Sequence, residues 1–402
     1  MIQITDHIPV VDVDSHVSEP PDLWTSRLAS KWSEWTPRIL DGGDREFWFV
    51  GPKPIVPAWH TSVAGWDGLF PDSPRTQADV DPAAYEPVAR AARLDEFGVR
   101  AQVLYPNVLG FHLAEFLSLD AQFTLDCVRA YNDFLTDFSA AAPGRFVPIS
   151  FAPLFDLDAT LAEVERCAAM GHRGILLANA PEKIGLPPIR SRHWDPLFSL
   201  AQEAGLPINF HIGFGVSAPG AADALTKGAS ADDPEERGRA AIAAARLSAR
   251  GFLSNADAII ELILAGICER FPRLNFVSVE SGYGYVPYLL ETLDWQWAAN
   301  GVDRAFPNQL LPSEYFRRQI YATFWYEHQT IDRLVDLYVD NLMFETDFPH
   351  PTSLSPGPQS NTLSARHVID ANLGHLPEEH LRKILHTNAA RLYRLDDLET
   401  AP

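Results

Sequence analysis

The sequence has few of the residues and segments that disulfide-bonded, secreted or membrane-spanning proteins depend on. Among its 402 residues there are three cysteines, Cys127, Cys167 and Cys268. They lie in separate helix-like segments without the spacing of a metal-binding pair, so we expect reduced, buried thiols. No apolar run is long enough to span a bilayer, and no basic stretch followed by an apolar core begins the chain. We therefore expect a cytoplasmic protein that neither crosses nor anchors to a membrane.

Basic residues are also few. The chain has 32 Lys and Arg against 53 Asp and Glu, a net charge of −21 at pH 7. Such a surplus of negative charge repels phosphates, which argues against nucleic acid and anionic membranes as partners. A small anionic substrate remains possible where a local positive feature, such as a metal ion, receives it. The expected partner is a small molecule.

Short apolar strands alternate with helix-like segments along most of the chain. The candidate strands lie at residues 10–14, 101–105, 146–151, 174–177, 208–211, 275–280, 320–324 and 342–347. This alternation is typical of an α/β fold with a parallel sheet, and eight such strands close into a TIM barrel. The alternative is an open doubly wound sheet, which is weakened because no glycine-rich phosphate loop follows the first strand.

Two segments interrupt this alternation. Residues from about 20 to 81 are rich in Trp, Pro and Gly, and Arg45–Val50 alternates as a short antiparallel strand does. Residues from about 213 to 251 follow the fifth strand, are rich in Gly and Ala, and have a helical centre. We predict one (β/α)₈ barrel domain over residues 1–402, with an N-terminal insertion over one end and a lid after the fifth strand.

Acidic and imidazole side chains stand at the ends of three of these strands. Asp14 and His16 leave the first strand two residues apart and so point to the same face. His211 ends the fifth strand and Asp347 ends the eighth. The C-terminal ends of barrel strands share one mouth, so the four side chains would surround one point. Such a set suits one divalent ion, Zn²⁺ or Mn²⁺, although any single member could instead cap a helix or bind backbone.

Further polar residues lie nearby. Glu280 ends the sixth strand and is a candidate general base, a further ligand or a structural carboxylate. His350 is a candidate for orienting Asp347 or touching substrate, with simple packing as the alternative. Asp12 lies one layer below Asp14 and is expected to accept core hydrogen bonds. Pocket walls are expected from Tyr105, Asn107, Asn179 and Phe324.

Five segments in order resemble the amidohydrolase-related family of metal-dependent TIM-barrel enzymes. They are Asp12-Val13-Asp14-Ser15-His16, Phe210-His211-Ile212-Gly213, Glu280-Ser281-Gly282, Thr346-Asp347-Phe348-Pro349-His350 and Leu385–Tyr393. The family includes aminocarboxymuconate semialdehyde decarboxylase and the resorcylate and carboxyvanillate decarboxylases. The resemblance covers nearly the whole chain and implies one metal ion held by Asp14, His16, His211 and Asp347. It also implies a homodimer, for which Trp295 and Trp297 are candidate interface residues unless they pack against the insertion.

Two positions depart from the family pattern and bear on the reaction. Asp14 stands where many members have a histidine, and an acidic residue there resembles the aromatic-acid decarboxylases. Glu280 stands where the family has a histidine that orients or activates metal-bound water. We predict decarboxylation of a small aromatic or unsaturated carboxylic acid, in which Asp347 helps move a proton to the carbon that loses CO₂. The alternatives are hydrolysis, with Glu280 or Asp347 as general base, and a barrel that has lost catalysis, against which the retained ligand set argues.

Overall fold

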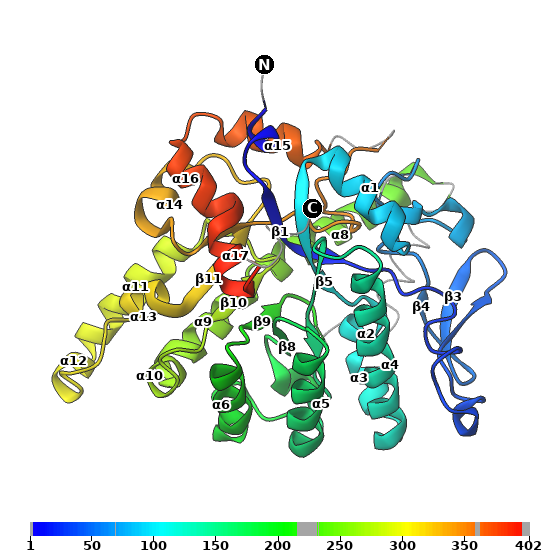
Figure 1. Ribbon diagram of the computed structural model, residues 1–402, viewed down its shortest axis with the longest axis horizontal. Coiled ribbons are helices and arrows are strands. Elements are labelled where there is room, and N and C mark those ends of the chain that lie inside the picture. Colours follow the sequence, from blue (N-terminus) through cyan, green and yellow to red (C-terminus); the bar gives the residue numbers. More distant parts are fainter. Residues whose placement is uncertain (1–2, 69, 215–230, 232, 358–361, 396–402) are drawn as a thin grey trace.

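The computed structural model describes residues 3–68, 70–214, 231, 233–357 and 362–395 (Figure 1). Strands of one ring are β1 Val10–His16, β5 Val99–Tyr105, β6 Phe146–Pro148, β7 Ser150–Phe151, β8 Ile175–Ala178, β9 Ile208–His211, β10 Phe276–Val279, β11 Ile320–Phe324 and β12 Leu342–Phe344. The insertion adds β2 Arg38–Asp41, β3 Glu46–Val50 and β4 Lys53–Pro57.

Helices follow the barrel strands and lie around them (Figure 1). The first half of the chain contributes α1 Pro87–Phe97, α2 Val108–Phe111, α3 Leu113–Leu117, α4 Ala121–Ala140, α5 Leu157–Ala169 and α6 Asp195–Ala204. The second half contributes α8 Pro234–Phe252, α9 Asn255–Leu264, α10 Ile267–Arg270, α11 Val286–Ala299, α12 Val302–Ala305, α13 Pro312–Gln319, α14 Ile331–Tyr338, α15 Ala365–Leu373, α16 Glu378–Arg382 and α17 Asn388–Tyr393. Among these described helices, none combines the length and the apolar character needed to cross a bilayer.

The strands pair in parallel around a closed ring. One run is β1-β5-β6 and the other is β7-β8-β9-β10-β11-β12. Only Ile149 separates β6 from β7, so together they make the third strand of the ring. The ring closes where the Asp347 N–H donates to the Asp14 carbonyl at 2.9 Å and the His16 N–H donates to the Phe348 carbonyl at 2.7 Å. The predicted eight-stranded barrel is confirmed.

The insertion is more regular than its composition indicates. Instead of one short strand, β2, β3 and β4 form an antiparallel sheet that projects to one side of the barrel (Figure 1). The chain then returns to the barrel mouth, where the Val63 and Ala64 N–H groups donate to the Pro349 carbonyl at 3.0 and 3.1 Å. The insertion is thereby fixed against the segment that follows the eighth strand.

The last helical region of the chain is interrupted. A π-helical turn, Lys383–Thr387, joins α16 to α17, and the Asn388 side chain donates to the Val339 and Leu342 carbonyls. Of the predicted lid, α8 is the described helical part. Residues 215–230 and 232 lie outside the described residues, so the lid stays a prediction.

Asp12 is the buried link between the first strand and the two strands beside it. Its Oδ1 accepts from the Thr346 N–H at 2.8 Å, and its Oδ2 accepts from Gln102 Nε2 at 2.7 Å and from the Thr346 hydroxyl at 2.5 Å. The side chain is fully buried, and burial raises its pKa to about 6. The expected core hydrogen-bonding role is confirmed.

Replacing this link should weaken the fold measurably. Asp12→Ala leaves the buried donors of Thr346 and Gln102 without an acceptor, which should cost about 3 kcal/mol of unfolding free energy. Urea unfolding followed by circular dichroism measures the change. The exposed Asp336 on α14 provides the control, since Asp336→Ala should alter stability by no more than about 0.5 kcal/mol. Equal stability of the two variants would contradict this role for Asp12.

Candidate metal centre

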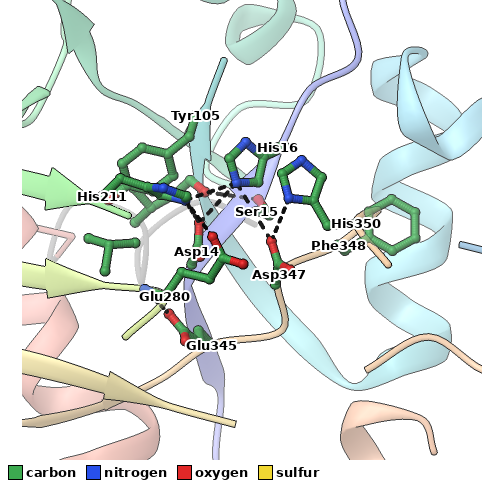
Figure 2. A network of polar contacts seen from close by, with 12 residues as sticks. Asp14, Ser15, His16, Tyr105, His211, Glu280, Glu345, Asp347, Phe348 and His350 are labelled. Atoms are coloured by element: carbon green, nitrogen blue, oxygen red, sulfur yellow. Dashed lines mark hydrogen bonds and ion pairs between the residues drawn. The ribbon is translucent and has the colours of Figure 1, made fainter. Parts of the chain in front are cut away.

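Four predicted residues meet at the barrel mouth, as Figure 2 shows. The Nε2 atoms of His16 and His211 are 3.0 Å apart. His16 Nε2 lies 3.6 Å from Asp14 Oδ1 and 3.6 Å from Asp347 Oδ1, and His211 Nε2 lies 3.5 Å from Asp14 Oδ1. Donors bound to one ion at about 2.0–2.2 Å are separated by roughly 3–3.6 Å from one another. The spacing therefore fits one divalent ion.

The tautomers of the two imidazoles strengthen this assignment. His16 Nδ1 lies 3.0 Å from the Pro106 carbonyl, and His211 Nδ1 lies 2.7 Å from the Ile212 carbonyl. A carbonyl can only accept, so each Nδ1 carries the proton and each Nε2 presents a lone pair. Burial lowers the pKa of His16, and lowers that of His211 to about 4, which keeps both rings neutral. Two lone pairs face each other at 3.0 Å and require a cation between them.

The carboxylates lead to the same conclusion. Both oxygens of Asp14 and Oδ1 of Asp347 are buried and have no hydrogen-bond partner within the described part of the chain. Burial and the neighbouring carboxylates raise the pKa of Asp14 and of Glu280 well above the ordinary range. A cation among these oxygens would remove the repulsion that raises those pKa values. The residues present therefore fit one divalent metal ion.

Backbone conformation turns two of the acids into the mouth. Glu280 directly follows β10 and Asp347 lies three residues beyond β12, with φ values of +53° and +58°. Residues other than glycine rarely adopt this left-handed conformation, which costs roughly 1–3 kcal/mol and is concentrated at functional sites. It also corrects two predicted bounds. The sixth strand stops at Val279 and the eighth at Phe344, because the chain turns at the acids instead of continuing extended.

Glu280 reaches the same point as the four predicted ligands. Its Oε2 is 3.5 Å from His211 Nε2, and its Oε1 is 3.5 Å from the Thr352 hydroxyl. The ligand atoms of Asp14, His16, His211 and Glu280 all lie within 4.8 Å of one another, whereas Asp347 belongs to a second such group with His16, Glu280 and His350. Glu280 and His16 therefore link Asp347 to the other predicted ligands. None of the ion pairs in the described residues joins Glu280 to a lysine or arginine. The geometry therefore favours a role at the centre over a structural salt bridge.

His350 connects Asp347 to the wall behind it. Its Nδ1 is 3.0 Å from Asp347 Oδ1, its Nε2 is 2.6 Å from Asn107 Oδ1, and its ring stacks on His16 at 3.7 Å between centroids. Asn107 Nδ2 donates to the Val17 carbonyl at 2.9 Å, which fixes Oδ1 toward His350. His350 therefore donates from Nε2, which leaves a lone pair on Nδ1, so its contact with Asp347 Oδ1 at 3.0 Å needs a proton or a cation between the two atoms. Its place beside Asp347 favours a role at the centre over simple packing.

The structure also identifies residues that the sequence did not single out. Thr352 donates its hydroxyl to Asp347 Oδ2, and Glu345 Oε2 accepts from the Glu280 N–H at 3.3 Å. The Phe111 ring lies 5.7 Å from the His16 and His350 rings and 5.8 Å from the His211 ring. A signal existed only for Thr352, which follows Asp347 in the same loop.

Three of the expected pocket-wall residues make contacts inside the barrel, and their role as pocket walls stays a prediction. The Tyr105 hydroxyl donates to Asn209 Oδ1 at 3.1 Å, below the centre, although its ring lies 5.4 Å from the His211 ring. Asn179 donates to Ser254 Oγ and Asn255 Oδ1, both at 2.9 Å. Phe324 is buried and packs at 5.8 Å against Phe344. Hydrogen bonding and packing therefore account for these side chains.

Removing a ligand should empty the centre. We expect the purified protein to bind about one divalent ion per chain, and His211→Ala and Asp347→Asn to lose most of it, because an incomplete ligand set shapes the site poorly. Elemental analysis after dialysis measures the content. His193→Ala, at an exposed histidine, should keep the wild-type content. Full occupancy in both ligand variants would refute the assignment.

The comparisons with known proteins agree with the barrel fold and with the motifs described above. The family model described as amidohydrolase matches residues 12–395. γ-Resorcylate decarboxylase from Rhizobium sp. (strain MTP-10005) is 23% identical over 322 residues, which cover 76% of this chain and 86% of that enzyme. An amidohydrolase from Mycobacterium avium subsp. paratuberculosis K-10 superposes with a TM-score of 0.72 at 26% identity, covering 96% of this chain and 99% of the other.

A further similar structure contains a bound metal ion. Dihydroxybenzoic acid decarboxylase from Polaromonas sp. JS666, with bound manganese and the inhibitor 2-nitroresorcinol, superposes with a TM-score of 0.60 at 19% identity. The match covers 97% of this chain and 98% of that enzyme. At this identity the likeness establishes the shared fold.

Proposed function

The chain belongs to the amidohydrolase family, as its motifs predicted, and from that premise we propose that it is a metal-dependent decarboxylase of a small aromatic carboxylic acid. The observation that carries the proposal is the buried cluster of two neutral imidazoles with the unpartnered oxygens of Asp14 and the unpartnered Oδ1 of Asp347. The decarboxylase from Rhizobium, similar over most of its length, supports the reaction class.

In this proposal Asp14, His16, His211 and Asp347 hold one divalent ion. Carboxylate oxygens suit Mn²⁺ and imidazole nitrogens suit Zn²⁺, so the two carboxylates of this ligand set are the part that favours Mn²⁺. Manganese in the similar decarboxylase from Polaromonas supports that preference. When bound, the ion supplies the positive charge that anchors the substrate carboxylate in an otherwise acidic mouth.

The residues around Asp347 are arranged to control a proton. Asp347 in its protonated form delivers the proton to the ring carbon as that carbon loses CO₂, so the bond to the carboxylate is replaced by a bond to hydrogen, and the Asp347 carboxylate then takes a new proton from solvent. Thr352 donates to Oδ2 of Asp347, and His350 Nδ1 lies 3.0 Å from Oδ1, where the two atoms can share the proton. The hydrogen bond from Thr352 fixes the direction in which Asp347 presents its oxygens.

Release of CO₂ tests the proposed reaction directly. Manganese-loaded protein incubated with 2,6-dihydroxybenzoate and other hydroxybenzoates should release CO₂ and the corresponding phenol, measured by carbon dioxide trapping and liquid chromatography. Asp347→Asn should abolish release, because it removes both a ligand and the proton donor. The lack of release from every hydroxybenzoate by fully loaded protein would refute the proposal.

Glu280→Gln separates decarboxylation from the alternative, metal-assisted hydrolysis. Hydrolysis needs a base for water, so the loss of a general base would reduce activity by roughly 10²–10⁴-fold. Decarboxylation breaks its bond without attack by water, so we expect metal to be retained and activity to fall by less than that range. A metal-replete variant without activity would favour hydrolysis, and loss of the ion would make Glu280 a ligand.

The remaining proposals concern assembly, location and the lid. Tyr288 and Trp295 on α11 are 76% and 72% exposed, which supports a homodimer that covers them. Trp297 is only 6% exposed, so the expectation that it lies at an interface is replaced by core packing. Light scattering of the wild type and Trp295→Ala would test the dimer. A cytoplasmic location and a lid over residues 213–251 are retained as proposals.

A further inference from the structure

A cavity adjoins the candidate metal centre at His350. It has a volume of about 280 Å³ and lies between described residues of the insertion and the segment that follows the eighth strand. Trp66 and Phe70 line it from the insertion, Ser355 and Gly357 line its other side, and His350 lines it as well. The described residues around this cavity include no aspartate, glutamate, lysine or arginine. A neutral, partly aromatic space therefore borders a strongly acidic centre.

The cavity is held in shape by contacts between its two sides. The paired hydrogen bonds from Val63 and Ala64 to the Pro349 carbonyl fix one side against the other. A Cβ on Gly68 would collide with the Trp66 indole, and a Cβ on Gly357 would lie 3.1 Å from the Trp66 carbonyl oxygen. Both glycines therefore permit close packing around Trp66. The indole is placed before any ligand arrives, which lowers the entropic cost of binding.

Ser355 provides a separate indication that a ligand binds here. Its side chain is 5% exposed, and its Oγ has no hydrogen-bond partner within the described residues. Buried hydroxyl groups almost always have a partner, and an unsatisfied one costs about 1–3 kcal/mol. Because Ser355 lines the cavity, a polar group of a bound molecule can supply that partner.

His350 sets the relation between the cavity and the reaction site. Its ring stacks on His16 at 3.7 Å, and its Nδ1 faces Asp347 at 3.0 Å, while the same residue lines the cavity. The cavity is thus separated from the metal ligands by about one imidazole ring. A molecule that occupies both sites would have its carboxylate at the centre and would extend past the edge of this ring into the cavity.

We propose that this cavity binds the tail of the substrate, an uncharged aryl group that packs on Trp66 and carries a hydroxyl or carbonyl that hydrogen-bonds to Ser355. The proposal rests on the proposed function and narrows it, since the substrate is then an aryl carboxylic acid with a second ring or ring-like substituent. The neutral walls exclude a second charged group from the tail, because its desolvation would be uncompensated.

Three acids test the proposal by isothermal titration calorimetry on manganese-loaded protein. Benzoate has the acid and one ring, biphenyl-4-carboxylate adds an apolar tail, and 4′-hydroxybiphenyl-4-carboxylate adds a hydroxyl to the tail. We expect wild-type affinity to rise by roughly tenfold with the second ring and by a further three- to tenfold with the hydroxyl.

Two variants separate the two contacts. Trp66→Ala should remove most of the gain from the second ring, and Ser355→Ala should remove only the gain from the hydroxyl. Both should keep wild-type metal content and circular dichroism, and Phe306→Ala, at an exposed phenylalanine outside the cavity, should keep all three affinities. Equal affinities of the wild type for benzoate and both biphenyl acids would overturn the proposal, as would unchanged gains in both variants.

The outcome for the cavity is distinguishable from that for the reaction. Loss of tail binding in Trp66→Ala, with no CO₂ released from any acid, would support the cavity while refuting the decarboxylase. Release of CO₂ from 2,6-dihydroxybenzoate at the same rate in wild type and Trp66→Ala, with equal binding of the three acids, would support the reaction and overturn the cavity.

Discussion

Two imidazole lone pairs that face each other at 3.0 Å, in a mouth lined by buried carboxylates, are the constraint on which the rest of this structure depends. Buried charge is tolerated only when it is paired. The buried Arg90 side chain does not neutralise these carboxylates, because its guanidinium donates to the His16 carbonyl at 2.6 Å. A cation that binds these residues only in the folded protein would therefore add to the free energy of unfolding.

The hydrogen bonds that close the barrel also position the centre. Two backbone hydrogen bonds join the first and last strands, one from the Asp347 N–H to the Asp14 carbonyl and one from the His16 N–H to the Phe348 carbonyl. Three of these four residues are proposed ligands. One layer below, Asp12 binds Thr346 and so fixes the residue before Asp347. An error in strand register would displace the ligands by several ångströms. The geometry of the centre and the closure of the fold are consequently one structural property.

Sequence predicted which side chains of the proposed ligand set converge, because two regular rules apply to them. Side chains two residues apart share a face of a strand, which pairs Asp14 with His16, and barrel strands end at one mouth, which adds His211 and Asp347. The left-handed turns at Glu280 and Asp347 follow no such rule, since acidic residues seldom adopt them without tertiary support. The burial of Trp297 was also not predicted from the sequence. Trp295 and Trp297 are two positions apart on a helix, so they lie on different sides of it and differ in exposure.

The contrast between the acidic centre and the neutral cavity explains how one orientation of a ligand can be selected. A net charge of −21 repels a carboxylate at long range, but screening limits that repulsion to about 8 Å at physiological ionic strength. Within the mouth, carboxylates repel the acid group everywhere except at the ion. The cavity beyond His350 has no charged wall among the described residues and favours an uncharged ring. Opposite ends of the proposed substrate would therefore meet opposite requirements, and the reacting carbon would be placed beside Asp347 by exclusion as much as by attraction.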